Sequence, residues 1–184
     1  DVYESGSAPI VGFLSVASKA AAFALLLRII YQVFGDIYVN WPLLISIIAA
    51  ASMIVGNIMA MVQTNIKRML GFSTIAHAGY LLIGVAAIAI VQNDSSFRLG
   101  VDGGASVLFY LATYAFANLT IFAGISVVGS RVGGDNISDY KALIRKSPQM
   151  AIMMSFALIA LIGIPPTGIF VSKFYIFSAA MENE

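Results

Sequence analysis

Residues 41–62 have the sequence WPLLISIIAAASMIVGNIMAMV, which no ionisable side chain interrupts. A helix needs about 20 predominantly apolar residues to cross the hydrocarbon core of a bilayer, and this stretch supplies them. Tyr38 and Trp41 lie at its start, and amphipathic aromatic side chains of this kind favour the membrane–water interface. The stretch therefore predicts a transmembrane helix over about 42–62.

Other apolar stretches of similar length lie on both sides of this segment. They predict further membrane spans over about 9–34, 67–92, 103–128 and 149–181. We therefore expect an all-α fold, a polytopic transmembrane helix bundle of about five spans that forms a single membrane domain over 1–184.

The last span contains a break near 163–168, where the sequence is GIPPTG. Gly163, Pro165, Pro166 and Gly168 mark this break. Proline has no backbone N–H and clashes with the preceding helical turn, so a regular helix cannot continue through the pair. The apolar residues on each side are too few for two separate spans, which favours one discontinuous span over a helical hairpin.

The composition of the chain agrees with a membrane location. Of its 184 residues, 60% are hydrophobic and 10% are charged, whereas a soluble domain carries about 25% charged residues. The net charge of +1 leaves no basic surface for a nucleic-acid partner. Because the chain has no cysteine and one histidine, disulfides, thiolate sites and iron–sulfur clusters are excluded, and a histidine-built metal site is disfavoured. We expect an integral, multi-pass membrane protein without a cofactor of its own.

Basic residues gather in two connections between the predicted spans. The residues concerned are Lys67 and Arg68 in the first connection and Arg131, Lys141, Arg145 and Lys146 in the second. The positive-inside rule therefore predicts that both connections lie on the cytoplasmic side of the membrane or its equivalent.

Residues outside the spans give three smaller expectations. Asp36, Asp94 and Asp102 fall in the connections that we expect on the other side of the membrane from the two basic connections. Residues 138–146 predict one short surface helix capped by Ser138. The chain starts at an aspartate without an initiator Met, so we expect it to be an internal piece of a longer protein.

Three basic side chains lie where a membrane span should have none. Lys19 and His77 each lie about ten residues into a predicted span, and Lys173 lies just past the proline break. Inserting a charged lysine at the bilayer centre costs about 2.5–3.5 kcal/mol, and no Asp or Glu falls inside any predicted span. Burial favours the neutral form of a lysine, so a partly dry lysine can exchange a proton near neutral pH, as histidine does without tuning. The three residues predict an intramembrane proton relay.

A structural role for these bases is the alternative. Lys173 could bond carbonyls freed by the break, Lys19 could extend toward an interface, and His77 could bond a neighbouring helix. A dry, fully bonded lysine would indicate a purely structural membrane module, whereas a hydrated lysine would indicate transport.

Three blocks of sequence resemble one family. Residues 63–80, QTNIKRMLGFSTIAHAGY, resemble the signature stretch of the antiporter-like subunits of proton-pumping NADH:quinone oxidoreductase, respiratory complex I. Residues 13–21, FLSVASKAA, resemble subunit N, also called subunit 2, more than the sister subunits L and M. The break at 163–166, followed by SKFY at 172–175, is similar to the discontinuous late helix of that subunit.

The resemblance implies a larger protein of about fourteen helices built from two inverted repeats. This chain would hold the eighth to twelfth helices, on a hydrated polar axis. By residue match, Lys19 would be a proton-relay lysine, His77 a connecting group and Lys173 the terminal lysine. The family's buried glutamate and an earlier lysine would lie on helices outside this chain.

The resemblance also implies a non-redox subunit, inactive as an isolated piece. NADH, flavin, iron–sulfur clusters and quinone would belong to other subunits. The expected partners are neighbouring membrane-arm subunits, lipid, protons and water, in a bacterial plasma membrane or else an inner mitochondrial or thylakoid membrane. A related cation/proton antiporter or a membrane-bound hydrogenase stays open, because such proteins share the stretch at 67–80 and the broken helix.

Overall fold

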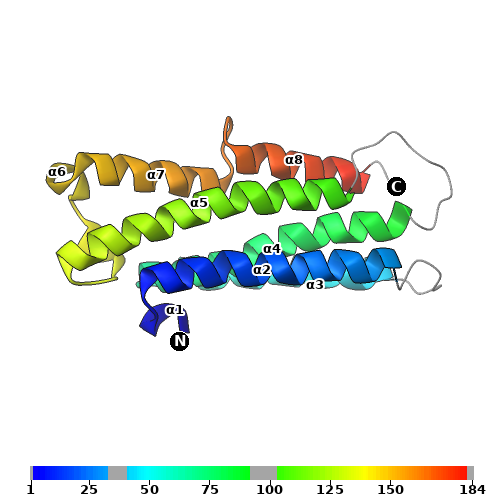
Figure 1. Ribbon diagram of the computed structural model, residues 1–184, viewed down its shortest axis with the longest axis horizontal. Helices are drawn as coiled ribbons and strands as arrows, with labels where there is room; N and C mark the ends of the chain where they lie inside the picture. The colour runs from blue at the N-terminus through cyan, green and yellow to red at the C-terminus, as the bar shows by residue number, and fades with distance from the viewer. Residues whose placement is uncertain (1, 33–40, 92–102, 182–184) are drawn as a thin grey trace.

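The structure is a computed structural model that describes residues 2–32, 41–91 and 103–181 (Figure 1). Its elements in chain order are α1 (Val2–Ser5), α2 (Ala8–Gln32), α3 (Trp41–Met61), α4 (Ile66–Val91), α5 (Gly103–Val132), η1 (Ile137–Tyr140), α6 (Leu143–Lys146), α7 (Pro148–Ile162) and α8 (Gly168–Met181). These residues form helices and connections, with one isolated β-bridge. The predicted all-α helix bundle is confirmed.

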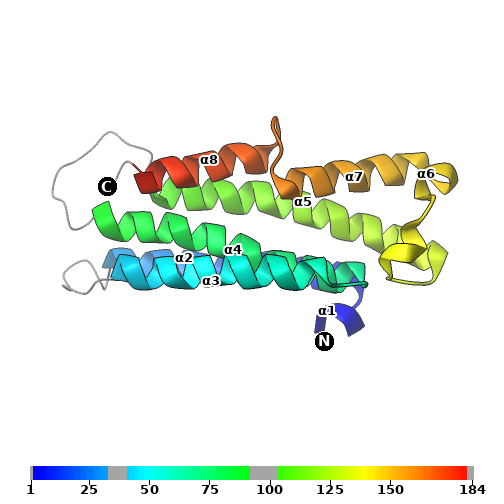
Figure 2. The same cartoon turned by 180° about the vertical axis from the view of Figure 1, so that it is seen from behind.

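Four of the helices, α2, α3, α4 and α5, are long and apolar enough to cross a membrane. They lie lengthwise beside one another (Figures 1 and 2). The shorter apolar helices α7 and α8 follow each other end to end along α5 (Figure 1). A hairpin would place these two helices side by side, so the discontinuous span predicted from the sequence is the arrangement observed.

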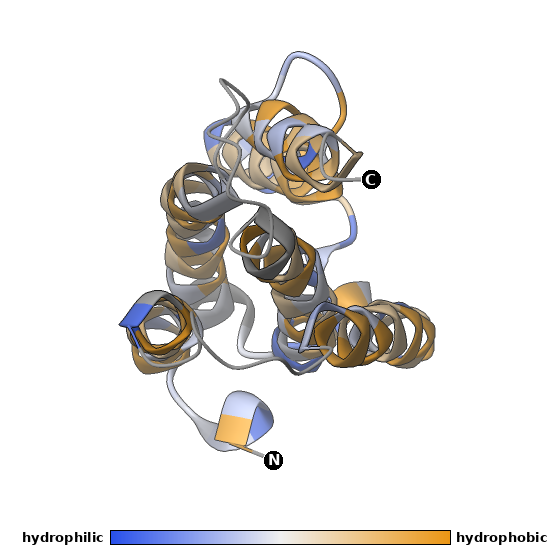
Figure 3. Ribbon diagram, turned by 90° about the vertical axis from the view of Figure 1, so that its right-hand side faces the viewer, coloured by the Kyte–Doolittle hydropathy of each residue, from blue (hydrophilic) through white to orange (hydrophobic). Residues whose placement is uncertain are grey.

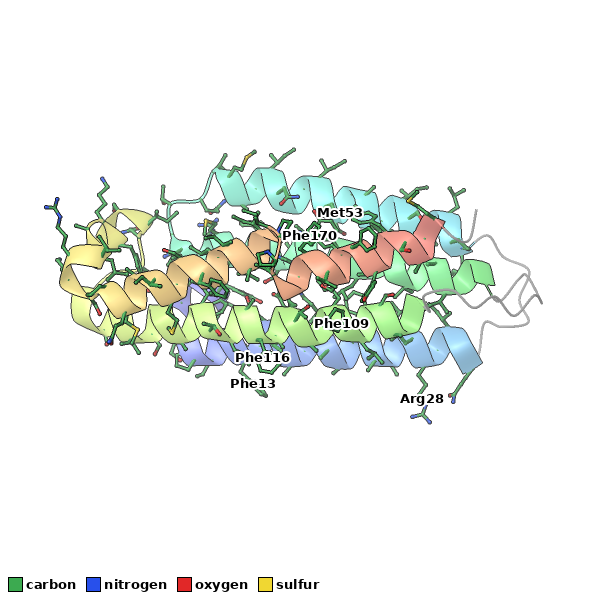
Figure 4. The ribbon with its side chains drawn as sticks, turned by 90° about the horizontal axis from the view of Figure 1, so that it is seen from above. Phe13, Arg28, Met53, Phe109, Phe116 and Phe170 are labelled. Carbon is green, nitrogen blue, oxygen red and sulfur yellow. The ribbon has the colours of Figure 1, made fainter. Side chains whose placement is uncertain are left out.

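Large apolar side chains cover the outside of the bundle as well as its interior. Phe13, Leu43 and Phe116 are 66%, 58% and 78% exposed, and the hydropathy colours of Figure 3 show hydrophobic residues along the ribbons of the long helices. Figure 4 shows Phe13 and Phe116 pointing away from α2 and α5. Such faces are stable against lipid and not against water, as in a multi-pass integral membrane protein.

Helices α3 and α4 approach each other closely at two glycines. A Cβ atom on Gly56 would lie 2.7 Å from the backbone nitrogen of Ala76, and one on Gly79 would lie 2.8 Å from the carbonyl oxygen of Ala49. Without a hydrophobic driving force between helices in lipid, small residues that permit backbone contact stabilise the pair. Gly79 is thus a packing point, and this contact places α4 against α3.

The two basic connections meet at one end of the bundle. Asn65 and Asn136 form an antiparallel bridge, and the N–H of Ile66 donates to the carbonyl of Asp135 at 2.9 Å. The Lys67 ammonium lies 2.7 Å from the Asp135 carboxylate. The structure therefore places both connections on the same side, as the charge pattern predicted. The acidic residues of the opposite connections (Asp36, Asp94 and Asp102) lie outside the described residues.

The single surface helix predicted over 138–146 is wrong. The segment forms two short helices, η1 and α6, separated by Lys141 and Ala142. Ala142 has a φ of 59°, in the left-handed region, and one such residue ends right-handed helical hydrogen bonding. The first helix begins after Asn136, whose backbone N–H donates to the Asp139 carboxylate at 3.1 Å, rather than at Ser138.

Candidate functional site

The three intramembrane bases come from three different helices. Lys19 lies on α2, His77 on α4 and Lys173 on α8. His77 is 4% exposed, and both lysines are partly buried. The structure brings these residues into one interior region, where α5 runs between α2 and α8 (Figure 1). By contrast, Arg28, near the end of α2, points away from the bundle (Figure 4).

Lys19 connects α2 to α4 and α5. Its ammonium Nζ donates a hydrogen bond to the backbone carbonyl of Thr74 at 2.6 Å. The same nitrogen lies 4.5 Å from the centroid of the Tyr114 ring. The Thr74 hydroxyl is 3.1 Å from the Tyr114 hydroxyl. Thr74 therefore contacts the ammonium through its backbone and the aromatic partner through its side chain.

Lys173 has a similar environment next to the helix break. Its Nζ donates to the carbonyl of Ile162 at 3.0 Å and lies 4.4 Å from the centroid of the Tyr80 ring. Ile162 is the last residue of α7, and the final carbonyls of a helix have no N–H partner further along it. Since Pro165 and Pro166 end α7 here, the break exposes the acceptor that Lys173 uses.

Two features of the structure favour glycine at position 163. Its φ of 83° lies in the left-handed region, which L side chains adopt at a cost. A Cβ atom would also lie 3.3 Å from the Nζ of Lys173. On the far side of the break, a Cβ on Gly168 would meet the Cγ2 of Thr113 at 3.1 Å, so small residues bring both helix ends close to their neighbours.

His77 lies among tyrosines that connect the two lysine environments. Its Nδ1 is 2.6 Å from the Tyr110 hydroxyl, and the tautomer decides which of the two atoms donates. The imidazole centroid lies 4.9 Å from that of Tyr114, next to Lys19, and 6.2 Å from that of Tyr80, next to Lys173. The three predicted bases thus lie near one another and are linked through aromatic side chains.

The tyrosines of this region were not predicted from the sequence. Tyr110 and Tyr114 are 0% and 1% exposed, and they lie one helical turn apart on α5, on the same face. Tyr80 lies three residues after His77, also on one face of its helix. A tyrosine inside an apolar span needs a partner for its hydroxyl, so this spacing near an intramembrane base is the signal that could have found them.

A second polar cluster extends from Lys19 toward α1. The Asn118 amide donates to the Ser15 hydroxyl, which donates to the carbonyl of Gly12 at 2.8 Å. The Tyr3 side chain lies near those of Thr74 and Ser15, and burial raises the pKa of Tyr3. The Asn118–Ser15 contact is an interhelical hydrogen bond between α5 and α2, of the kind that stabilises helix packing in membranes.

The carboxylates of the described residues that form ion pairs lie at the end of the bundle. Asp135 pairs with Lys67 at 2.7 Å, and Glu4 pairs with Arg68 at 3.3 Å. Within residues 2–32, 41–91 and 103–181, no group of three histidine, cysteine or acidic side chains is placed to hold a metal ion. The interior site is therefore built from amines, hydroxyls, an imidazole and carbonyls.

A family described as NADH:quinone oxidoreductase/Mrp antiporter, transmembrane, matches residues 1–184. The chain is 43% identical over 183 residues to NADH-quinone oxidoreductase subunit N of Desulforamulus reducens. It is 41% identical over 185 residues to NAD(P)H-quinone oxidoreductase subunit 2 of Crocosphaera subtropica. Each match covers 100% of this chain but 36% and 33% of the relative.

A solved structure of respiratory complex I from Thermus thermophilus with bound aureothin contains a similar chain. The TM-score is 0.76 at 30% sequence identity, over 99% of this chain and 37% of that chain. The chain thus spans about a third of the length of each of these three proteins.

Proposed function

Because the chain belongs to the NADH:quinone oxidoreductase/Mrp antiporter transmembrane family, we propose that it works in the membrane arm of a proton-pumping NADH:quinone oxidoreductase. Its role is to relay protons through Lys19, His77 and Lys173. The chain performs no redox chemistry, and electron transfer from NADH to quinone takes place in other subunits. Relatives named subunit N and subunit 2 support this assignment.

One observation supports the relay in particular. Two lysines from different helices each face a tyrosine ring, and both rings lie near one buried histidine, His77. Like charges repel strongly where the dielectric constant is low. Protonation of one lysine therefore raises the cost of a second positive charge nearby, and this coupling can move a proton onward when an external driver alternates the charge at one end.

Each base has a defined task in this proposal. Lys19 takes up a proton as the neutral amine, and the Thr74 carbonyl then accepts a hydrogen bond from the resulting ammonium. His77 passes the proton between the two lysine environments, with Tyr110 fixing one of its ring nitrogens. Lys173 releases the proton beside the helix break, where the Ile162 carbonyl orients it. Water and neighbouring membrane-arm subunits complete the proton path, and lipid surrounds the subunit, in a bacterial plasma membrane.

The test is substrate-driven proton pumping with Lys19→Met in the full-length subunit of the assembled complex, in sealed vesicles. Lys146→Met is the matched control, because this lysine is exposed on α6 at the end of the bundle. We expect the proton yield per NADH oxidised to collapse in the first variant and to be unchanged in the second. Normal pumping by assembled Lys19→Met complex would refute the relay.

A cation/proton antiporter is the second candidate, because the matching family also includes Mrp antiporters. The two functions differ in what drives them. Proton movement that needs NADH and quinone supports the oxidoreductase, whereas proton movement driven by a sodium gradient without NADH supports the antiporter.

A further inference from the structure

The two intramembrane lysines have the same kinds of partner. Each ammonium donates to one backbone carbonyl, at 2.6 Å for Lys19 and 3.0 Å for Lys173. Each also faces one tyrosine ring, at 4.5 Å and 4.4 Å from the centroid. We name Lys19 with Tyr114, and Lys173 with Tyr80, the two lysine–tyrosine pairs.

Both rings are held in position by groups other than the lysines. The Tyr114 hydroxyl contacts Thr74 at 3.1 Å, and its ring lies against His77. The Tyr80 ring meets Phe177 edge-on, with centroids 6.3 Å apart and an interplanar angle of 83°. The rings are therefore a fixed part of the bundle interior, and their faces are presented to the ammonium groups.

Several titratable groups surround the pairs. They are His77 and Tyr80 of α4, Tyr110 and Tyr114 of α5, and Tyr3 of α1. Helices α3 and α7 contribute no ionisable side chain. None of the groups named here is a carboxylate, and each lysine nitrogen contacts a backbone carbonyl and a tyrosine ring.

We propose that the tyrosine of each lysine–tyrosine pair is a positioning residue that holds the protonated lysine through the negative face of its ring. This inference rests on the proposed proton relay. A ring quadrupole attracts the lysine nitrogen when it is a charged ammonium and not when it is a neutral amine. The ring therefore holds the protonated form of the lysine and releases the neutral form. The carbonyl accepts a hydrogen bond from either form.

A neutral partner suits a relay better than a carboxylate does. A carboxylate would cancel the charge of the ammonium and, by favouring the protonated lysine, would make the lysine hold its proton strongly. A tyrosine ring attracts the ammonium more weakly and leaves the net charge of the pair at +1. The neighbouring histidine and the other lysine therefore still respond to that charge across the low-dielectric interior.

The test compares Tyr114→Phe with Tyr114→Leu in the full-length subunit of the assembled complex, with Tyr80→Phe and Tyr80→Leu as a second set. Proton pumping per NADH oxidised is measured from neutral into alkaline pH. Phenylalanine keeps the ring face, so its profile should match the native one. Leucine removes the ring and destabilises the protonated lysine, so pumping should fail at a pH lower by about one unit.

Phe122→Leu is the matched control, because Phe122 is a buried aromatic residue of the same helix that is 1% exposed, like Tyr114. We expect it to lower the yield of complex at most, without moving the pH profile. A profile that the leucine variants leave unchanged, or that the phenylalanine variants shift equally, would overturn the inference.

The inference and the proposed function fail in different ways. If Lys19→Met stops pumping while the tyrosine variants leave the pH profile unmoved, the relay stands and the positioning role is wrong. If Lys19→Met and Lys173→Met both pump normally, the relay itself is wrong, and the positioning role falls with it.

Discussion

Lys67 at the end of the bundle is buried and Lys19 in its interior is partly buried, and the partners of the two lysines differ. Lys67 is 6% exposed, pairs with the Asp135 carboxylate at 2.7 Å and donates to the Gly6 carbonyl at 3.0 Å. Lys19 has a carbonyl and a tyrosine ring. A carboxylate neutralises an ammonium permanently, whereas a ring leaves its charge free to change. The first arrangement therefore joins segments together, and the second suits a group that gains and loses a proton.

The largest expected effect concerns the interior lysine at the helix break. Lys173→Met should lower the proton yield of assembled complex by at least about tenfold, because the last proton-carrying group is lost. Lys173→Arg keeps the positive charge but cannot release a proton, so it should fail as well. Both variants are measured by dye quenching in sealed vesicles, and efficient pumping by the arginine variant would show that charge alone suffices.

Loss of the Lys67–Asp135 ion pair at the end of the bundle should lower stability and leave the proton yield unchanged. Asp135→Asn leaves the buried Lys67 ammonium without its counter-ion and should cost about 1–3 kcal/mol of stability, since the carboxylate is partly exposed to solvent. The proton yield of the complex that assembles should stay normal. Thermal unfolding of the purified complex measures the first effect. A double variant, Lys67→Met with Asp135→Asn, should recover part of the loss, and additive losses would argue against a coupled pair.

A substitution at Gly163 tests whether the helix break positions Lys173 for proton transfer. Gly163→Ala forces a residue with a Cβ atom into a φ of 83° and should cost about 1–2 kcal/mol. The same Cβ atom crowds the Lys173 ammonium, so the proton yield should also fall. Ile164→Ala, in the same loop but with an exposed side chain, is the control. A normal proton yield in Gly163→Ala would separate the break from proton transfer.

The smallest expected effect is on the pH dependence of stability at the end of the bundle. Burial, and then the charges of Asp135 and Asp139, raise the pKa of Tyr140 to about 12. Since the unfolded chain loses this proton near pH 10, the stabilisation is complete below about pH 10 and is lost as the pH rises toward 12. Tyr140→Phe should therefore lose less stability than the native protein over this range, as measured by thermal unfolding at successive pH values.

The fold was predictable because the lengths of the apolar stretches determine it. The break in the last span followed from the two prolines, and the discontinuous arrangement followed from the short apolar stretches beside them. The surface segment at 138–146 was mispredicted, because the left-handed Ala142 interrupts it. An alanine in the sequence does not indicate a left-handed backbone conformation. At Ala142 this conformation depends on how the chain turns between α5 and α7.

The three interior bases could also be found from the sequence, because an ionisable group in an apolar span is conspicuous. Their proposed roles stay predictions. The tyrosines were missed because each one, taken alone, is an ordinary amphipathic residue. Their importance depends on which groups face them across helix interfaces, and local periodicity carries no information about this.

The sequence by itself determined a membrane-embedded helix bundle, the position of its broken helix and the presence of basic residues in spans that contain no Asp or Glu. These properties depend on how many consecutive residues avoid water and on where proline removes a backbone donor, and both are local quantities. Only the tertiary structure decided that Lys19 meets Thr74, 55 positions away in the chain, and that each interior lysine faces a tyrosine ring. Such contacts depend on the close approach of whole helices, which glycines such as Gly56 and Gly79 permit but do not specify.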